Sequence, residues 1–305
     1  MKSYIRMVLF LFVLSAISAI LLTFFALETK EYIAKNRQKE RFIHILKAMR
    51  ILPEETQKLL AKDEKLKSMP DSTVQEKFQK EAVTIERTEY YLKKEKTEQI
   101  LETFSSSIDV LELTPKNQIV LYKGKEFAYL PSNKVDYLHN LYIFRAKKED
   151  HFYYTFEIAG AGFWDKVAGY MALKEGFKSI AGITFYDHKE TPGLGQRIEE
   201  GWFQGQFTFW NKSIFREGSA QPELRVTSRK GTYDGEATQD FGKKQNEVDA
   251  ITGASETSRA LDRFVTKNLL HMFGRLAKIV EGKEGKEFFD TTTQAFLKNY
   301  PVAKP

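Results

Sequence analysis

The stretch FYYTFEIAGAGFWDKVAGYMALKEGFKSIAGITFYD, residues 152–187, contains three segments with the composition of β-strands. Each segment is rich in aromatic or β-branched side chains, and they cover residues 152–160, 166–173 and 179–187. An earlier segment, QIVLYK at residues 118–123, has the same character. Because the pattern changes from helical to strand-like near residue 105, we expect an α+β domain in the C-terminal part of the chain.

The N-terminal region contains 20 consecutive residues without a charge, Met7 to Ala26. As a helix they would extend about 30 Å, the thickness of the hydrocarbon core of a bilayer, so we expect one transmembrane helix. A cleaved signal peptide that ends near SAISA is the alternative, but the apolar run continues beyond it through ILLTFFA. Basic residues flank the run on both sides, so their count leaves its orientation open.

A charged region separates the apolar run from the strand-like segments. Phe42, Ile45, Leu46 and Met49 recur at helical spacing and predict a juxtamembrane helix. Residues 53–100 are dominated by Lys, Glu and Gln and indicate exposed helices or a charged insertion. We therefore expect four parts: an anchor at 1–27, the juxtamembrane helix and insertion at 28–104, the main domain at 105–282, and a C-terminal tail at 283–305.

Composition excludes several classes of function. The chain has 305 residues and no cysteine, so it cannot use a thiol nucleophile or a cysteine-ligated cluster. Its five histidines show no close pairing at ligand spacing, and we expect no protein-bound metal. The net charge of +6 is spread along the chain without a basic motif interleaved with aromatic residues, and we expect no nucleic-acid partner.

The segment HKETPGLGQRIE, residues 188–199, follows a predicted strand. Its residues 191–194 suit a type II turn, since Pro192 fixes φ at the second position and Gly193 accepts a positive φ at the third. The G-x-G-x-x-G spacing of a dinucleotide fingerprint is absent after Gly193 and Gly195. By its residues alone the segment is either an ordinary strand-to-helix turn or part of a binding site.

A second segment, DAITGASETSRAL at residues 249–261, crowds hydroxyl and carboxylate side chains around a Gly-Ala pair. In the structural interpretation, Thr252 or Ser255 caps a helix whose apolar face follows. A helix that begins near Ser255 would also direct unpaired N–H groups and the positive end of its dipole outward. A phosphate ester on a hydroxyl at that point would be stabilised, so the segment is also a candidate attachment point.

This second segment resembles the flavinylation motif of the FMN-binding domain family, D-x-x-[ST]-G-A-[TS]. The match runs through Asp249, Thr252, Gly253, Ala254 and Ser255. A second family motif, around HKETPGLG, lies about sixty residues earlier, as it does in the family. The likeness covers residues 152–273. It favours the branch found in sodium-pumping NADH:quinone oxidoreductases, with the RnfG branch of ferredoxin:NAD oxidoreductases as the near alternative.

The resemblance implies a single transmembrane helix followed by an extracytoplasmic FMN-binding domain at 105–282, with a mainly antiparallel sheet and flanking helices. It implies FMN joined through its phosphate to Ser255, where the family usually has Thr. The other residues implied to surround the cofactor are Asp249, Thr252, Gly253, Ala254, Thr257, Glu190, Thr191, Leu194 and Gly195. Trp164 is either an aromatic wall beside the flavin or part of the sheet core.

By the same resemblance, a separate magnesium-dependent flavin transferase would supply FMN from FAD. The chain would then be an electron-transfer subunit of an ion-pumping NADH:quinone oxidoreductase, and would lie in the cytoplasmic membrane beside other subunits. Two alternatives stay open. One is a different electron carrier, either RnfG-like or a stand-alone anchored flavoprotein, and the other is an anchored non-redox scaffold in which Ser255 only caps a helix.

Overall fold

The computed structural model describes residues 2–51, 85, 88, 108–114, 117–123, 142–148, 150–209, 212–227, 246–280 and 287–301. The chain divides into two units, Met1–Arg41 and Phe42–Pro305. The predicted charged insertion at 53–100 lies outside the described residues, apart from Ile85 and Thr88.

The first unit is the exposed part of a single long helix, α1 (Lys2–Met49). This helix contains both the predicted anchor and the predicted juxtamembrane helix without a break. It is apolar and long enough to cross a membrane, and no other described helix meets that test. The last turns of α1, from Phe42 onward, belong to the second unit and are buried there.

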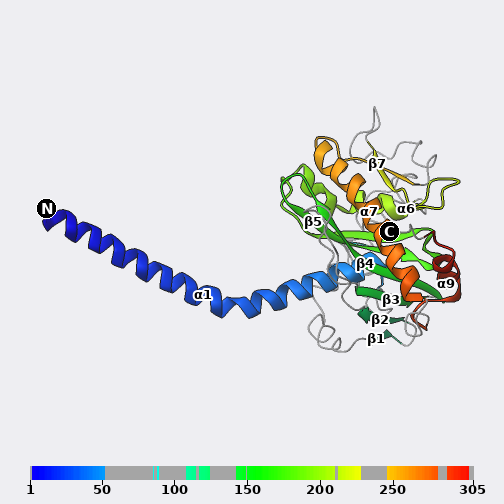
Figure 1. Cartoon of the computed structure of the whole chain (residues 1–305), viewed down its shortest axis with the longest axis horizontal. Coiled ribbons are helices and arrows are strands. Elements are labelled where there is room, and N and C mark those ends of the chain that lie inside the picture. The colour runs from blue at the N-terminus through cyan, green and yellow to red at the C-terminus, as the bar shows by residue number, and fades with distance from the viewer. Residues whose placement is uncertain are drawn as a thin grey trace, which may run out of the picture. The chain divides into compact units, whose positions relative to one another are not determined.

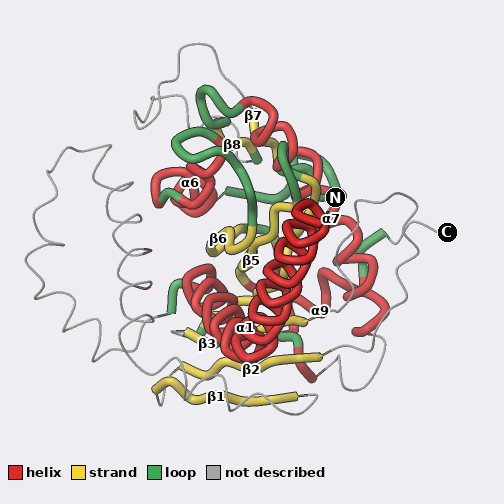
Figure 2. The backbone as a smooth tube through the Cα atoms, turned by 90° about the vertical axis from the view of Figure 1, so that its left-hand side faces the viewer, coloured by secondary structure: helices red, strands yellow, loops and turns green. Residues whose placement is uncertain are grey.

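The centre of the second unit is a six-stranded antiparallel sheet in which neighbours in sequence are neighbours in space (Figures 1 and 2). Its strands are β1 (Ile108–Thr114), β2 (Asn117–Lys123), β3 (Tyr142–Lys148), β4 (His151–Ala161), β5 (Lys166–Lys174) and β6 (Ile180–Asp187). A short parallel pair, β7 (Arg225–Thr227) and β8 (Glu247–Asp249), lies apart from it. The α+β class and all four predicted strand segments are confirmed.

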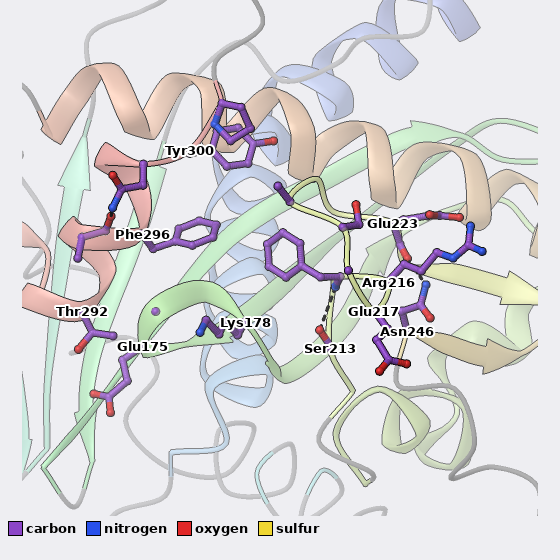
Figure 3. A pocket seen from close by; sticks show the side chains of 18 of the residues that line it. Glu175, Lys178, Ser213, Arg216, Glu217, Glu223, Asn246, Thr292, Phe296 and Tyr300 are labelled. Atoms are coloured by element: carbon purple, nitrogen blue, oxygen red, sulfur yellow. Dashed lines mark hydrogen bonds between the residues drawn. The ribbon is translucent and has the colours of Figure 1, made fainter.

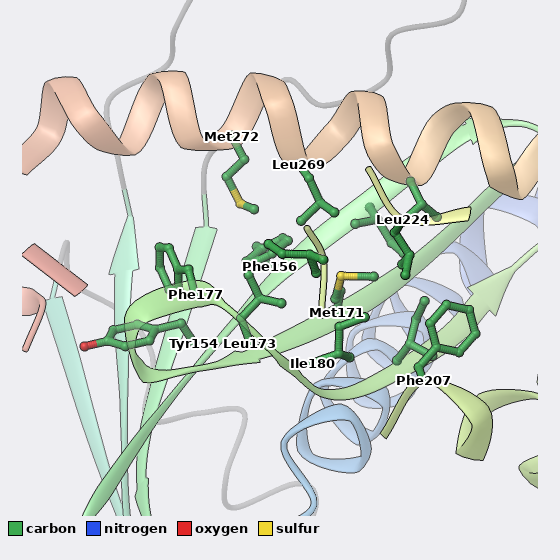
Figure 4. Packing of buried hydrophobic residues seen from close by; sticks show 14 of the residues in the cluster. Tyr154, Phe156, Met171, Leu173, Phe177, Ile180, Phe207, Leu224, Leu269 and Met272 are labelled. Carbon is green, nitrogen blue, oxygen red and sulfur yellow. The ribbon is translucent and has the colours of Figure 1, made fainter. Parts of the chain in front are cut away.

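Alternate residues of the strands face opposite sides of the sheet, and both sides are covered. On β5, Met171 and Leu173 belong to one apolar core, whereas Tyr170 and Ala172 belong to the other. Helix α7 (Ser255–Val280) covers the first side, where Leu269 and Met272 point at the sheet (Figure 4). The buried last turns of α1 cover the second. The sheet therefore positions the helix whose first turn carries Ser255.

Two glycines let the covering helices approach the sheet. A Cβ at Gly160 of β4 would lie 2.3 Å from the Cβ of Phe264 on α7. A Cβ at Gly182 of β6 would lie 2.1 Å from the carbonyl oxygen of Ala48 on α1. Only glycine fits such close contacts, so these positions determine where each helix crosses the sheet.

The remaining elements complete the first core. They are the short helices η1 (Glu175–Phe177), η2 (Gly195–Glu199), α6 (Gly201–Phe209) and α9 (Thr291–Lys298). Asp290 caps α9 by accepting from the backbone N–H groups of Thr292 and Thr293 at 2.8 and 3.0 Å. The hydroxyl of Tyr154 on β4 donates to the same carboxylate at 2.8 Å. The segment predicted as a tail thus includes a packed helix, which the sequence analysis did not anticipate.

Candidate functional site

The turn after β6 has the conformation expected from its sequence. Gly193 has φ +73°, and the N–H of Leu194 donates to the carbonyl of Thr191 at 3.1 Å. The predicted type II turn is therefore confirmed. It leads directly into η2 and α6, and the side chain of Leu194 at its end is partly exposed.

Glu190, immediately before this turn, is a buried carboxylate with only 5% of its surface exposed. Its Oε1 accepts from the backbone N–H of Phe163 at 2.8 Å and from that of Trp164 at 3.4 Å. Its Oε2 accepts from the hydroxyl of Thr257 at 2.5 Å. One side chain thus connects three segments: the loop between β4 and β5, the type II turn and the first turn of α7.

The loop between β4 and β5 presents two aromatic side chains to solvent. Phe163 and Trp164 are 53% and 65% exposed and meet edge to face, with ring centroids 4.8 Å apart. The indole Nε1 of Trp164 donates to the Thr191 hydroxyl at 2.9 Å. The alternative that placed Trp164 in the sheet core is therefore wrong, and an exposed aromatic surface adjoins the turn.

An ion pair fastens the outer side of the same loop. Lys189 donates to Asp165, which also accepts from the backbone N–H of Lys166 at 2.7 Å. The hydrogen bond from Lys189 is the main cause that lowers the pKa of Asp165. Both groups are exposed, so the pair contributes little to stability but holds the loop beside the turn.

Helix α7 begins at Ser255, which is exposed. Ala254 stands before it, at the position that a capping residue takes, so Ser255 begins the helix and does not cap it. The buried hydroxyl of Ser258 accepts from Ile251 N–H at 3.1 Å and donates to the Ala254 carbonyl at 2.9 Å. Two hydroxyls three residues apart therefore have different surroundings: that of Ser258 is buried in the turn, and Ser255 is accessible.

The segment that precedes α7 is also held in place. Gly253 has φ +81°, a conformation that suits glycine, and a Cβ there would lie 3.2 Å from a methyl carbon of Leu194. Asp249 is buried at the end of β8, and its backbone N–H donates to the side chain of Gln206 at 2.8 Å. Thr252 and Gly253 are exposed, like Ser255.

Most of the residues expected at the site are brought together by these contacts. Glu190 bonds to Thr257, Trp164 bonds to Thr191, and Leu194 approaches Gly253. A Cβ at Gly195 would lie 2.5 Å from the Thr257 hydroxyl. Sequence reasoning missed Phe163 and Gln206. Phe163 precedes Trp164, which the resemblance places at the site, whereas nothing in the sequence pointed to Gln206.

The chemistry of this region fits a flavin phosphate ester. The accessible hydroxyl of Ser255 lies at the N-terminus of a long helix, where an anion is favoured, and an exposed aromatic and aliphatic surface lies nearby. The described residues contain no cluster of three or more His, Asp or Glu side chains that could hold a metal ion.

A separate cavity of about 1240 Å³ lies between η1, α9 and the segment around Phe215 (Figure 3). Phe215, Phe296 and Tyr300 form its aromatic lining. The lining residues include none of those expected to surround the flavin, so this cavity is not the candidate site.

Comparison with known proteins agrees with the geometry. Residues 162–269 match the model of the FMN-binding domain family. The NqrC subunit of the Na(+)-translocating NADH-quinone reductase from Pseudomonas aeruginosa is 32% identical over 47% of this chain and 44% of its own length. The NqrC subunit from Yersinia pestis is 31% identical over 34% of this chain and 35% of its own length.

A solved structure of NqrC, from Parabacteroides distasonis, is 29% identical, with a TM-score of 0.35 over 43% of this chain and 60% of that one. The chain spans less than half the length of these curated relatives. Residues 162–269 thus match the FMN-binding domain family, and the chain is similar to the C subunits of Na(+)-translocating NADH-quinone reductases.

Proposed function

We propose that this chain is a membrane-anchored electron-transfer subunit that carries FMN esterified to the Oγ of Ser255. The observation that carries the proposal is the accessible Ser255 hydroxyl at the start of α7, within a family match at residues 162–269. FMN accepts and donates one or two electrons, and the protein contributes attachment and orientation.

The choice of hydroxyl follows from burial. Thr257 and Ser258 are only 3% and 2% exposed, and their hydroxyls donate to Glu190 and to the Ala254 carbonyl. A transferase could not reach either oxygen without unfolding the first turn of α7. Ser255 is accessible in the folded domain, and Gly253 next to it carries no side chain that would obstruct the approach.

The attachment reaction is a phosphoryl transfer carried out by a separate flavin transferase. The Ser255 oxygen would form a bond to the FMN phosphorus of FAD while the diphosphate bond breaks, and AMP leaves as the hydroxyl proton is removed. Helix N-termini stabilise phosphate through free N–H groups and the helix dipole, by about 0.3–1 kcal/mol for each charge. The product ester would therefore sit in a favourable environment.

The remaining expected residues would surround the attached flavin. Trp164 and Leu194 offer exposed apolar surface on which an isoalloxazine ring could lie, and Thr191 fixes the indole of Trp164. Gly195 lies against Glu190 and Thr257, whereas Asp249, Thr252 and Ala254 would shape the segment that a transferase recognises. These roles rest on the family resemblance together with the observed positions.

By similarity to its relatives, the chain would work beside other subunits of an NADH:quinone oxidoreductase that transports Na⁺. Helix α1 supports membrane anchoring by its length and apolar composition. The family resemblance favours an extracytoplasmic C-terminal domain. In that arrangement the quinone reductase activity belongs to the complex, and this chain carries electrons within it.

The test is the intact mass of the full chain, co-expressed with a flavin transferase and purified in detergent. We expect an added mass of FMN less one water, and fluorescence that survives denaturation. Ser255→Ala should lack both. Label on the Ala variant would show that the acceptor is another residue, whereas an unlabelled parent chain beside an active transferase would favour the non-redox scaffold.

A further inference from the structure

The first observation is that the Glu190 carboxylate has protein donors on both oxygens. Its Oε1 faces the N–H groups of Phe163 and Trp164, and its Oε2 faces the hydroxyl of Thr257. A buried charge is tolerated only when such partners compensate it. The three donors come from two segments that are separated from Glu190 by 26 to 67 residues in the sequence.

The second observation is that two glycines enclose this carboxylate. A Cβ at Gly162 would lie 2.4 Å from its Oε1, and a Cβ at Gly195 would lie 2.7 Å from its Oε2. The backbone therefore approaches both oxygens so closely that no side chain could be accommodated at either position. A flavin atom would meet the same obstruction, so Glu190 is poorly placed to bond to the cofactor.

The third observation concerns what the carboxylate connects. Thr257 lies two residues after Ser255, in the first turn of α7, and Trp164 lies on the exposed aromatic loop. The positive end of the α7 dipole also favours a negative charge at this position. Glu190 thus joins the turn that offers the attachment hydroxyl to the loop that offers the aromatic surface.

We infer that Glu190 is a positioning residue that fixes the Trp164 loop against the first turn of α7, and that it is not a ligand of the flavin. This inference rests on the proposed function, and it changes the expected role of Glu190 and Thr257 from flavin contact to support. The outer Lys189–Asp165 ion pair is exposed and cannot replace this inner connection.

A carboxylate is needed because both of its oxygens accept hydrogen bonds. In Glu190→Gln one oxygen becomes an NH₂ group, which can only donate, so the Thr257 hydroxyl can no longer donate to it. The remaining amide oxygen is uncharged and accepts more weakly from the loop N–H groups than the carboxylate does. The shape of the side chain is kept, so the variant should fold. The weakened hydrogen bonds should make the loop that carries Phe163 and Trp164 more mobile, whereas FMN should still be attached at Ser255.

The experiment compares Glu190→Gln and Thr257→Val with two controls. Thr257→Ser keeps the hydroxyl and should behave as the parent. Glu256→Gln removes an exposed negative charge from the same helical turn, where Glu256 contacts Arg259, without touching the Glu190 carboxylate. Full chains in detergent are measured without flavin by hydrogen exchange, and after labelling by mass and by visible circular dichroism.

We expect the Phe163 and Trp164 amides to exchange about tenfold faster in Glu190→Gln, since hydrogen bonds to charged groups are among the stronger ones. Thr257→Val should loosen the same loop. Both variants should still gain the mass of FMN, but should lose most of the visible circular dichroism that a fixed flavin shows. Both controls should match the parent in every measurement.

Two outcomes would overturn the inference. Unchanged amide exchange and dichroism in Glu190→Gln would show that the loop does not depend on this carboxylate. A folded Glu190→Gln chain that gains no FMN, while the parent does, would place Glu190 in the attachment step itself. Failure of the proposed function is distinguishable, because the parent would then remain unlabelled while the exchange measurement still tested the loop.

Discussion

Gly160 of β4 lies directly beneath Phe264 of α7: a Cβ at Gly160 would stand 2.3 Å from the Phe264 Cβ. The neighbouring Ala159 is beyond the part of β4 that pairs with β3, and Asn268 of α7 bonds to both its backbone N–H and its carbonyl, at 3.3 and 2.8 Å. Within the described part of the chain, the Asn268 side chain thus occupies the hydrogen-bonding position that a neighbouring strand would take beside Ala159. The two contacts together determine how α7, and with it Ser255, is placed on the sheet.

Gly160→Ala should accordingly destabilise the domain by overpacking, by about 1–3 kcal/mol. Gly274→Ala is the control: Gly274 lies on α7, the helix that carries Phe264, and a Cβ there would meet nothing within 4 Å. It should be neutral or stabilising, by up to about 1 kcal/mol, because alanine favours helix. Urea unfolding of the detergent-solubilised chains measures both, and equal midpoints for the two variants would contradict the close contact.

Tyr154→Phe should cost about 1–3 kcal/mol, because the buried hydroxyl donates to the Asp290 carboxylate and accepts from the Asp290 N–H. Burial raises the pKa of Tyr154 above its ordinary value. The hydrogen-bonded Tyr154 hydroxyl therefore stabilises the fold fully below about pH 10, the pKa of an unfolded tyrosine. Above that pH the unfolded state gains a phenolate, and this stabilisation is lost as the pH rises. The stability difference between parent and variant should be constant up to that pH and then narrow.

The sheet was predictable where strands carry a local signal. Strands β4 to β6 are long, aromatic and β-branched, and their segments stood out in the sequence. Strand β3 was not predicted. Its neighbouring residues Ile143 and Phe144 are buried on opposite faces of the sheet, so the sequence lacks the alternation of apolar and polar residues that marks a strand with one exposed face. Helix α9 has only eight residues, and the contact of its cap with Tyr154 spans 136 residues.

In the candidate site, too, features set by the local sequence could be predicted and features set by tertiary contacts could not. The type II turn and the start of α7 follow from short-range rules for Gly, Pro and helix termini, and both were predicted. The role of Glu190 could not be predicted, since its partners are decided by tertiary contacts over up to 67 residues. The accessibility of Ser255 beside the buried Ser258 likewise required the fold.

Helix α1 should keep the chain in the membrane. None of the residues in its apolar segment is buried, so a bilayer is the natural environment of that segment. The full chain should remain in the membrane pellet through high-salt and carbonate washes, whereas a variant without residues 2–27 should be released. A mature chain recovered in solution, beginning near residue 20, would show that the segment is a cleaved signal.

Gly193→Val should disturb the flavin more than the fold. A Cβ at Gly193 meets nothing within 4 Å, so the cost comes from its positive φ and should be about 1–3 kcal/mol. The folded fraction should still gain FMN, but with altered flavin absorbance or reduction potential. Gly218→Val is the control, since Gly218 also has a positive φ and open surroundings but lines the separate cavity. If Gly193→Val and Gly218→Val had the same flavin absorbance and reduction potential, the type II turn would not be part of the flavin site.

Ser255→Ala and Ser258→Ala should have opposite effects on labelling and stability. Ser258 is buried, and its loss would leave the Ile251 N–H without its acceptor, so the Ala variant should be destabilised by about 1–3 kcal/mol yet still carry FMN. Ser255 is exposed at the first helical position, so its Ala variant should lose the label with a change in stability within about 0.5 kcal/mol.

Ser255→Thr completes this comparison, because it restores the usual family acceptor and should be labelled as well as the parent or better. In-gel flavin fluorescence measures the label, and urea unfolding measures the stability of the same preparations. A role for Ser255 in stabilising the helix alone predicts that the Ala variant loses stability and that no variant in the series differs in label. Fluorescence lost from Ser258→Ala but kept in Ser255→Ala would place the ester on the buried hydroxyl, which is possible only if attachment precedes folding of this turn.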